Sequence, residues 1–278
     1  MDEELETAFL EAQTGKLAAS TLIGYRRNLS FVRRRFPGQW PGWLDLTTVK
    51  LRDFFIARQR EGVSASTTRY QATTLRRFYH YLLERGLVNQ NPLTGIQFDN
   101  INYNESGLPT YQLLMESIKQ NRKRATTMEK TATYLVIETG MRTSELIYLT
   151  WGQVDFAMRV VLIKNDEGVG RYVPLTSDLL DLLNKLRETF LTPPDATTPV
   201  LALANGKKIS RAWIERTIRR VSGGATPAGL RHAYIDKVVS EERFEDANRL
   251  AGHKTLVATA RYQVNQFHDL KKKYEQYF

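Results

Sequence analysis

A segment that favours neither helix nor strand divides the sequence and constrains most strongly how the chain can fold. Residues 98–109 read FDNINYNESGLP, which gathers Asn, Asp, Ser, Gly and Pro without a sustained apolar period. This composition is typical of a linker. We therefore predict a domain at 1–98, a linker at 99–109 and a second domain at 110–278, each domain being long enough to bury its own core.

The first part carries helical periodicity. Apolar positions recur at helical spacing in residues 20–36 and again in residues 66–86, and residues 46–59 look like a shorter helix between them. Arginines fill the positions between the apolar ones in 20–36, which makes the exposed side of that helix cationic. Gly86 and the following Pro92 end the last helix. The first part is thus predicted to be a small helical bundle.

The second part is predicted to be mostly helical with a small sheet. Two short β-branched runs, 160–163 and 171–175, flank the turn segment KNDEGVG and predict a hairpin. Helical patterns cover residues 111–118, 129–138, 143–149, 178–190, 211–221, 230–241 and 244–250. The expected fold class is mainly α with a small β-sheet, in which a helical N-terminal domain precedes a mixed α/β domain.

Composition limits the partners and the chemistry. The 278 residues include 40 Lys and Arg against 30 Asp and Glu, so the formal net charge is +10. Residues 1–100 hold 14 of the basic and 10 of the acidic residues, so both parts are basic. A positive excess favours polyanions such as nucleic acids. The absence of Cys excludes a disulfide scaffold, a thiolate metal site and a Cys nucleophile.

The N-terminus lacks the features of a targeting segment. It reads MDEELETAF, with acids where a signal or transit peptide needs cationic and apolar residues. No apolar run approaches the roughly 18 residues of a membrane span. We expect a soluble, cytoplasmic protein with no membrane partner, associated with the nucleoid if the source is prokaryotic.

Four segments of the second part carry polar residues that a simple core does not explain. Residues 139–151, TGMRTSELIYLTW, place Arg142 at a helix start after a Gly turn, where it could face a phosphate or pair with a nearby Glu. Residues 161–175, VLIKNDEGVGRYVPL, place Lys164 and Arg171 on either side of the hairpin turn. A cation there could donate a proton or remain solvated.

The other two segments lie near the C-terminus. Residues 226–236, TPAGLRHAYID, place Arg231 and His232 at a helix start after a Pro-bearing turn. Residues 250–263, LAGHKTLVATARYQ, place His253 at a helix start and Tyr262 nine residues later. Taken singly, such residues are more often a capping His and a half-buried Tyr.

The order of these segments resembles the tyrosine recombinase (phage integrase) family. Residues 20–92, with STLIGYRRNLSFV and TTLRRFYHYLLERGLVNQNP, are also similar to the core-binding, SAM-like N-terminal domain of that family. The resemblance implies a catalytic domain in the second part. It also implies a site-specific recombinase or integrase that cleaves and rejoins double-stranded DNA as a homo-tetramer on paired sites, without metal or nucleotide.

The resemblance implies one role for each matching residue. Arg142 and Arg231 match the arginines that clamp the scissile phosphate. Lys164 matches the hairpin lysine that protonates the leaving 5′ oxygen, and His253 matches the histidine that donates a hydrogen bond to the phosphate. Tyr262 matches the nucleophile that forms a 3′-phosphotyrosyl bond.

One position departs from the family pattern. The family usually reads H-x-L-R-H, whereas this chain has Ala228 in the place of the first histidine. By register His232 is the non-catalytic histidine of that element, so the resemblance does not assign it the missing role. An attenuated enzyme, compensation from elsewhere in the chain or from a partner, and an engineered substitution all remain open.

The chemistry of the candidate residues agrees with this resemblance. A tyrosine hydroxyl has an unperturbed pKa of about 10 and needs a cationic environment or a base to attack a phosphate. Two arginines can neutralise the developing charge without a metal. The acids around the hairpin, Asp155, Asp166 and Glu167, are interpreted as turn and surface residues and not as a two-metal site.

Basic clusters predict the DNA contacts. Residues 207–220, KKISRAWIERTIRR, carry six Lys and Arg and one Glu on a predicted helix. The alternative is an ordinary charged face. The predicted DNA-binding residues are Arg26, Arg33, Arg69, Arg76, Arg171, Lys207, Lys208, Arg211 and Arg219.

The sequence leaves two other functions open. The chain could be a DNA-binding protein of the same fold that has lost efficient catalysis, or a type IB topoisomerase.

The tail at 263–278 can form an apolar stripe through Val264, Phe267, Leu270 and Tyr274. We expect the tail to dock on a neighbouring protomer, and packing on its own domain is the alternative.

Overall fold

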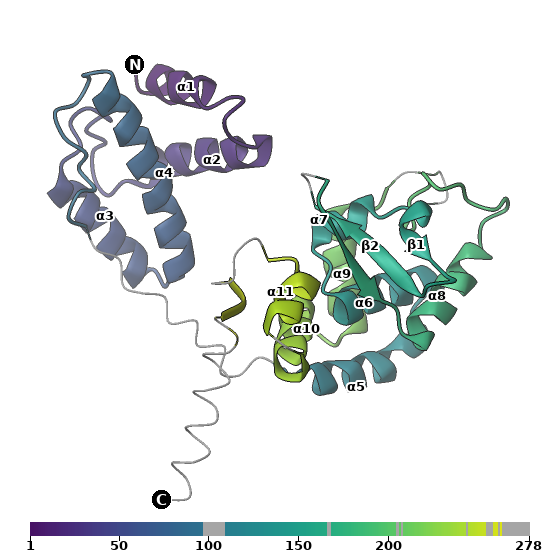
Figure 1. The fold of residues 1–278 in the computed structure, drawn as a ribbon. Coiled ribbons are helices and arrows are strands. Elements are labelled where there is room, and N and C mark those ends of the chain that lie inside the picture. Colours follow the sequence, from purple (N-terminus) through teal and green to yellow (C-terminus); the bar gives the residue numbers. More distant parts are fainter. Residues whose placement is uncertain are drawn as a thin grey trace, which may run out of the picture. The chain divides into compact units, whose positions relative to one another are not determined.

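The computed structural model divides the chain into two units, Met1–Tyr103 and Asn104–Phe278 (Figure 1). It describes residues 1–96, 109–165, 168–203, 206, 208–242, 244–253, 258–260 and 262, with the backbone alone at residue 244. Residues 99–108 of the predicted linker and the whole predicted tail, 263–278, lie outside the described residues. The domain boundary therefore stays a prediction.

The N-terminal unit is helical. Its helices are α1 (Asp2–Ala12), α2 (Ala19–Arg35), α3 (Thr48–Arg60) and α4 (Ala65–Glu84). The caps Thr47 and Ser64 begin α3 and α4 because their side chains accept hydrogen bonds from backbone N–H groups of the first turn. Aromatic residues dominate the buried core, and Phe9, Trp43 and Phe78 are completely buried.

The sequence did not predict α1, whose acidic start was considered only as a possible targeting segment. Its carboxylates bind residues far along the chain. Asp2 accepts a hydrogen bond from Trp40 Nε1 (2.7 Å), and Glu6 accepts one from Trp43 Nε1 (2.9 Å). These contacts, with the burial of Phe9, fix α1 on the bundle.

The second unit combines helices with one small sheet. The elements in chain order are α5 (Tyr111–Asn121), the short 3₁₀ turn η1 (Arg122–Arg124), α6 (Thr127–Thr139), α7 (Thr143–Tyr148), η2 (Trp151–Gln153), β1 (Val154–Asp155), β2 (Val160–Lys164), β3 (Gly170–Pro174), α8 (Ser177–Arg187), α9 (Arg211–Val221), α10 (Pro227–Glu241) and α11 (Phe244–Ala251). The sheet is antiparallel in the order β1-β2-β3, with Ile163 opposite Arg171 in the predicted hairpin. The predicted fold class is confirmed.

Helix α6 forms the centre of the second unit. It packs against α8, α9 and α10 (Figure 1). Its residues from Thr131 to Thr139 are all buried. Burial on every side is expected of a helix at the centre of a domain. The chain leaves the core at the C-terminal end of α6, and the polar residues of the candidate site begin directly after it.

Two local expectations differ from the structure. Helix α10 begins at Pro227 because Thr226 caps it and a proline is tolerated in the first turn, so Arg231 lies in the second turn. The helix predicted over 211–221 is confirmed as α9, but the basic segment 207–220 is not helical throughout, since residue 208 precedes the cap Ser210. His253 follows Gly252 after the end of α11 at Ala251, and the helix expected to begin there falls on residues 254–257, which lie outside the described residues.

Within the described residues, no helix combines the length and apolar character needed to cross a membrane. The same residues contain no group of three or more His, Cys, Asp or Glu side chains that could hold a metal ion.

Candidate active site

Three arginine side chains converge on the C-terminal end of α11. The last carbonyl groups of a helix lack backbone partners, and the helix dipole makes this end negative. Guanidinium groups from α7, β3 and α10 supply the missing donors. The pairs are Arg171 Nε with the Leu250 carbonyl (3.0 Å), Arg231 Nη2 with the Ala251 carbonyl (2.6 Å) and Arg142 Nη2 with the Gly252 carbonyl (2.9 Å).

The turn between α6 and α7 positions two of these arginines. Gly140 ends α6 with a left-handed φ of 62°, and its carbonyl accepts a hydrogen bond from Arg231 Nη1. Arg142, two residues later, is the N-cap residue of α7. This short turn therefore binds the side chain of Arg231 and includes the backbone of Arg142.

Substitution of Gly140 by alanine is expected to damage this turn. A Cβ atom there would lie 2.3 Å from the ring of Tyr234, which is buried on α10. The left-handed backbone and the overpacking together should lower the free energy of unfolding by roughly 2–4 kcal/mol. Denaturant unfolding of the variant would measure this loss.

Gly168→Ala is the matched control for that measurement. Gly168 also has a left-handed φ, of 80°, but an added Cβ would meet no atom within 4 Å. Gly168→Ala should therefore lower the free energy of unfolding only by the cost of the left-handed backbone. Equal losses in the two variants would mean that the contact with Tyr234 is unimportant.

Glu145 is the acidic centre of the cluster. Its side chain is 3% exposed, and it accepts two hydrogen bonds from Arg171, at 2.9 and 3.0 Å. It also accepts bonds from the backbone N–H of Arg142 (2.7 Å) and from Arg142 Nη1 (2.8 Å). Burial alone would raise the pKa of the Glu145 carboxyl, but these donors outweigh burial and hold the pKa below its ordinary value.

The site carries an excess of positive charge. Burial, with the charges of Arg142 and Arg171, lowers the pKa of Arg231 to about 10. Among the described residues of the cluster, three guanidinium groups share the single carboxylate of Glu145. Such a group of cations is stabilised when an anion binds beside it.

His253 is neutral in this environment. Burial and then the charges of Arg231, Arg142 and Arg171 lower its pKa to about 4. Its Nδ1 lies 2.9 Å from Thr259 Oγ1, and Thr259 donates its hydroxyl proton to Asn248 Oδ1 (2.7 Å). Since that proton is committed, Nδ1 of His253 is the donor to Thr259, and Nε2 is left as an acceptor.

Tyr262 lies between two histidines. It is 8% exposed, and its ring centroid lies 6.1 Å from that of His253 and 5.7 Å from that of His232. Its Oη lies 2.7 Å from His232 Nδ1. Arg231 is close enough to Tyr262 to interact with it electrostatically.

The structure thus brings together four of the five predicted catalytic residues, namely Arg142, Arg231, His253 and Tyr262. The fifth, Lys164, is exposed at the end of β2 and takes no part in the hydrogen bonds described above. Ala228 is exposed in the first turn of α10.

Arg171 differs from its predicted role in DNA contact. Its side chain is only 10% exposed, and the bidentate pair with Glu145 occupies its guanidinium group. An added Cβ on Gly252 would come within 2.6 Å of its Nη1, which shows how tightly the turn after α11 encloses it. Arg171 therefore holds the site together, and it is not placed to reach a groove.

The other predicted DNA-binding residues have different surroundings. Arg33 is paired with Glu3 (2.7 Å) and Glu6 (3.1 Å) of α1, which indicates a structural role. Lys208 lies over the ring of Tyr148, 4.3 Å from its centroid. Arg26, Arg211 and Arg219 are exposed and Arg69 is half-buried, while Lys207 lies outside the described residues.

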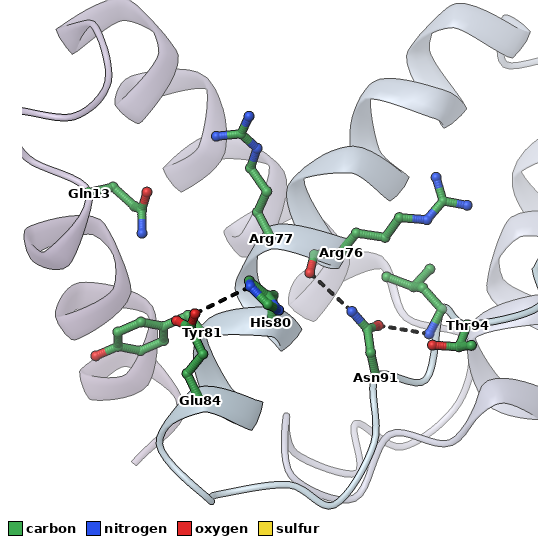
Figure 2. A pocket seen from close by; sticks show the side chains of 9 residues that line it. Gln13, Arg76, Arg77, His80, Tyr81, Glu84, Asn91 and Thr94 are labelled. Carbon is green, nitrogen blue, oxygen red and sulfur yellow. Dashed lines mark hydrogen bonds and ion pairs between the residues drawn. The ribbon is translucent and has the colours of Figure 1, made fainter.

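Arg76 lines a pocket of about 470 Å³ in the N-terminal unit. Figure 2 shows Arg76 and Arg77 extending in different directions from adjacent positions of α4. Asn91 braces the pocket by donating to the Arg76 carbonyl (3.1 Å) and accepting from the Leu93 N–H (3.0 Å). The pocket is basic and holds none of the predicted catalytic residues.

Sequence reasoning missed two parts of this site. It treated Glu145 only as one possible partner of Arg142, although the Arg-x-x-Glu spacing at a helix start is itself a signal for that pair. It left His232 without a role, because no spacing rule connects it with Tyr262 thirty residues later.

Family models match both parts of the chain. The phage integrase family matches residues 110–268, and the phage integrase N-terminal SAM-like domain matches residues 8–86. Among curated proteins, the tyrosine recombinase XerC of Lactobacillus delbrueckii subsp. bulgaricus is 25% identical over 99% of this chain and 98% of its own length. The XerC of Alcanivorax borkumensis is 23% identical over 95% of this chain and 89% of its own length.

Solved structures share the fold over most of the chain. A lambda integrase tetramer bound to a Holliday junction has a TM-score of 0.76 at 18% identity, covering 94% of this chain and 76% of that one. The Tn1549 transposon integrase in complex with a circular intermediate DNA has a TM-score of 0.73 at 15% identity, covering 93% of each chain.

Proposed function

Because the chain belongs to the phage integrase family, we propose that it is a site-specific DNA recombinase that cleaves and rejoins DNA through Tyr262. The curated relatives are tyrosine recombinases, and the solved neighbours are integrases in complex with DNA. The proposal includes binding of double-stranded DNA and assembly of a homo-tetramer on paired sites.

The observation that carries this proposal is the cluster of guanidinium groups at the end of α11, one of which, that of Arg231, interacts with Tyr262. Arg142 and Arg231 project toward the turn after α11, and among the described residues of the cluster Glu145 is the single carboxylate that balances their charge and that of Arg171. A phosphodiester is an anion whose planar oxygens suit bidentate arginine contacts. Arg142 is 40% exposed and can therefore reach such a ligand.

In the proposed reaction Tyr262 Oη attacks the scissile phosphorus. Negative charge grows on the non-bridging oxygens, and Arg142 and Arg231 stabilise it in the transition state. The 5′ oxygen leaves as a hydroxyl, with Lys164 as its proton donor. The 3′-phosphotyrosyl bond conserves the energy of the phosphodiester, so a 5′ hydroxyl can later attack it and rejoin the strand.

A second function is favoured by one residue. Ala228 has no polar side-chain atom where the family usually has a histidine, as in a DNA-binding protein that has lost efficient catalysis. Such a protein would have no need of the arrangement around Tyr262, which combines a buried tyrosine with two histidines and Arg231. We therefore place recombination first.

Trapping of a covalent adduct tests the proposal. A target site is first selected by binding from a DNA library. The chain is then incubated with a duplex that is nicked near the cleavage position, so that the leaving fragment is lost and the adduct accumulates. Mass spectrometry should place a 3′-linked nucleotide on Tyr262. DNA that binds tightly but yields no adduct would support the second function instead.

Binding of the phosphate should also change the charge of His253. The free site holds its pKa near 4 because of burial and the neighbouring arginines. An anion between those arginines offsets their charge and raises the pKa, so a proton is taken up on binding and affinity should increase as the pH falls from 7 toward 5. Calorimetry in buffers of different ionisation enthalpy would count this proton.

His253→Gln is the comparison for that experiment. It preserves a polar side chain but cannot take up the proton. We expect the variant to bind fewer protons with DNA and to show a weaker pH dependence of affinity. The same proton count in both proteins would exclude His253 as the group that titrates.

A further inference from the structure

Nδ1 of His232 lies within hydrogen-bond distance of the hydroxyl of Tyr262. The two residues are separated by 2.7 Å between Nδ1 and Oη, and their rings are inclined by 35°. An unprotonated Nδ1 accepts a hydrogen bond from a phenol, so the proton of Tyr262 can point at His232. At this distance a proton can pass directly between the two atoms.

The neighbouring histidine is oriented differently. His253 stacks on the same tyrosine ring, with 24° between the planes, but its Nδ1 is bound to Thr259. Burial and the neighbouring arginines also oppose a second proton on His253, since they lower its pKa to about 4. His253 is therefore held by its hydrogen bond to Thr259, whereas Nδ1 of His232 contacts the hydroxyl of Tyr262.

The position of His232 on α10 is related to that of Ala228. The two residues are four apart in one helix, so they lie one turn apart on the same side. Ala228 is exposed, and its methyl group can neither hold nor move a proton. His232 thus places an imidazole one helical turn after Ala228, the position at which the family usually has a histidine.

We propose that His232 is a catalytic residue that accepts the proton of Tyr262 during strand cleavage. This inference rests on the proposed function. As the Oη–P bond forms, the P–O5′ bond breaks and its electron pair stays on the 5′ oxygen. The Tyr262 proton moves to His232 Nδ1, while the 5′ oxygen receives its proton from Lys164 or water. In rejoining, His232 returns the proton to Tyr262 as the phosphotyrosyl bond breaks.

The first test is single-turnover cleavage by His232→Gln and His232→Ala on the nicked duplex. General bases typically contribute 10²- to 10⁴-fold, so a loss of about this size is expected without a change in DNA affinity. Ser240→Ala, at the exposed end of the same helix, should cleave at the wild-type rate. A wild-type rate in His232→Gln would overturn the inference.

Chemical rescue separates proton transfer from a structural role. Imidazole added to His232→Ala can occupy the vacated space and take the proton, so it should restore cleavage in proportion to its concentration. It should have no effect on Tyr262→Phe. If His232→Ala is folded and binds DNA but imidazole restores nothing, His232 acts only in packing and the inference is wrong.

A DNA with sulfur in place of the 5′ bridging oxygen adds a further distinction. A thiolate leaves without needing a proton, so this substrate should restore cleavage by Lys164→Ala but not by His232→Ala. Restoration of both variants would place His232 on the leaving group and overturn the assignment. Absence of any adduct with the wild-type chain would instead refute the proposed function, and with it this role.

Discussion

Tyr262→Phe is expected to abolish the covalent DNA adduct while DNA affinity is unchanged. The substitution removes only the oxygen that attacks the phosphate, and the ring can still pack between His232 and His253. Loss of a nucleophile costs about 10⁶-fold in rate in a well-studied hydrolase, which would place cleavage below detection here. Denaturing electrophoresis of the trapped complex measures the adduct, and a binding assay on the same duplex measures affinity.

Tyr172→Phe is the control for this prediction. Tyr172 is 66% exposed on β3 of the same unit, so its hydroxyl can be lost without change to the site. The control should form adduct at the wild-type rate. Adduct that persists in Tyr262→Phe would show that another residue is the nucleophile.

Most helices could be predicted because their apolar residues recur at a single period. The structure places α2, α4 and α9 within a few residues of the predicted ranges, and the local caps Ser64 and Ser210 define where α4 and α9 begin. Helix α1 could not be predicted in this way. Its place depends on Asp2 and Glu6 binding tryptophans at positions 40 and 43, and such distant contacts leave no local pattern.

The candidate site could be predicted only in part for the same reason. The resemblance identified Arg142, Arg231, His253 and Tyr262, because each lies in a segment with a recognisable order of residues. It could not show that Arg171 is turned inward. That orientation depends on Glu145, which lies 26 residues earlier and is buried beneath both arginines.

Glu145 therefore links the stability of the fold to the geometry of the site. It holds the backbone N–H and the guanidinium of Arg142, and it holds Arg171 against the end of α11. Loss of its charge would leave the nearly buried Arg171 without a counter-ion and would release Arg142 from its fixed position. The same substitution should thus weaken both folding and catalysis.

We expect Glu145→Gln to lower the free energy of unfolding by about 3–5 kcal/mol at pH 7, as when one partner of a buried ion pair is removed. The exposed Glu188→Gln, at the end of α8, should change it little. Urea unfolding of the three proteins would measure the difference. Equal stabilities would mean that Arg171 finds another partner or reaches water.

The stability difference between wild type and Glu145→Gln should depend on pH. Because the folded-state pKa of Glu145 is below its ordinary value, the carboxylate stabilises the folded chain fully above about pH 5. This stabilisation is lost as the pH falls through the lowered pKa and Glu145 becomes protonated in the folded chain. The difference between wild type and Glu145→Gln should therefore be largest near neutral pH and shrink below pH 4. A difference that stays constant from pH 7 to pH 3 would show that the effect comes from the shape of the side chain and not from its charge.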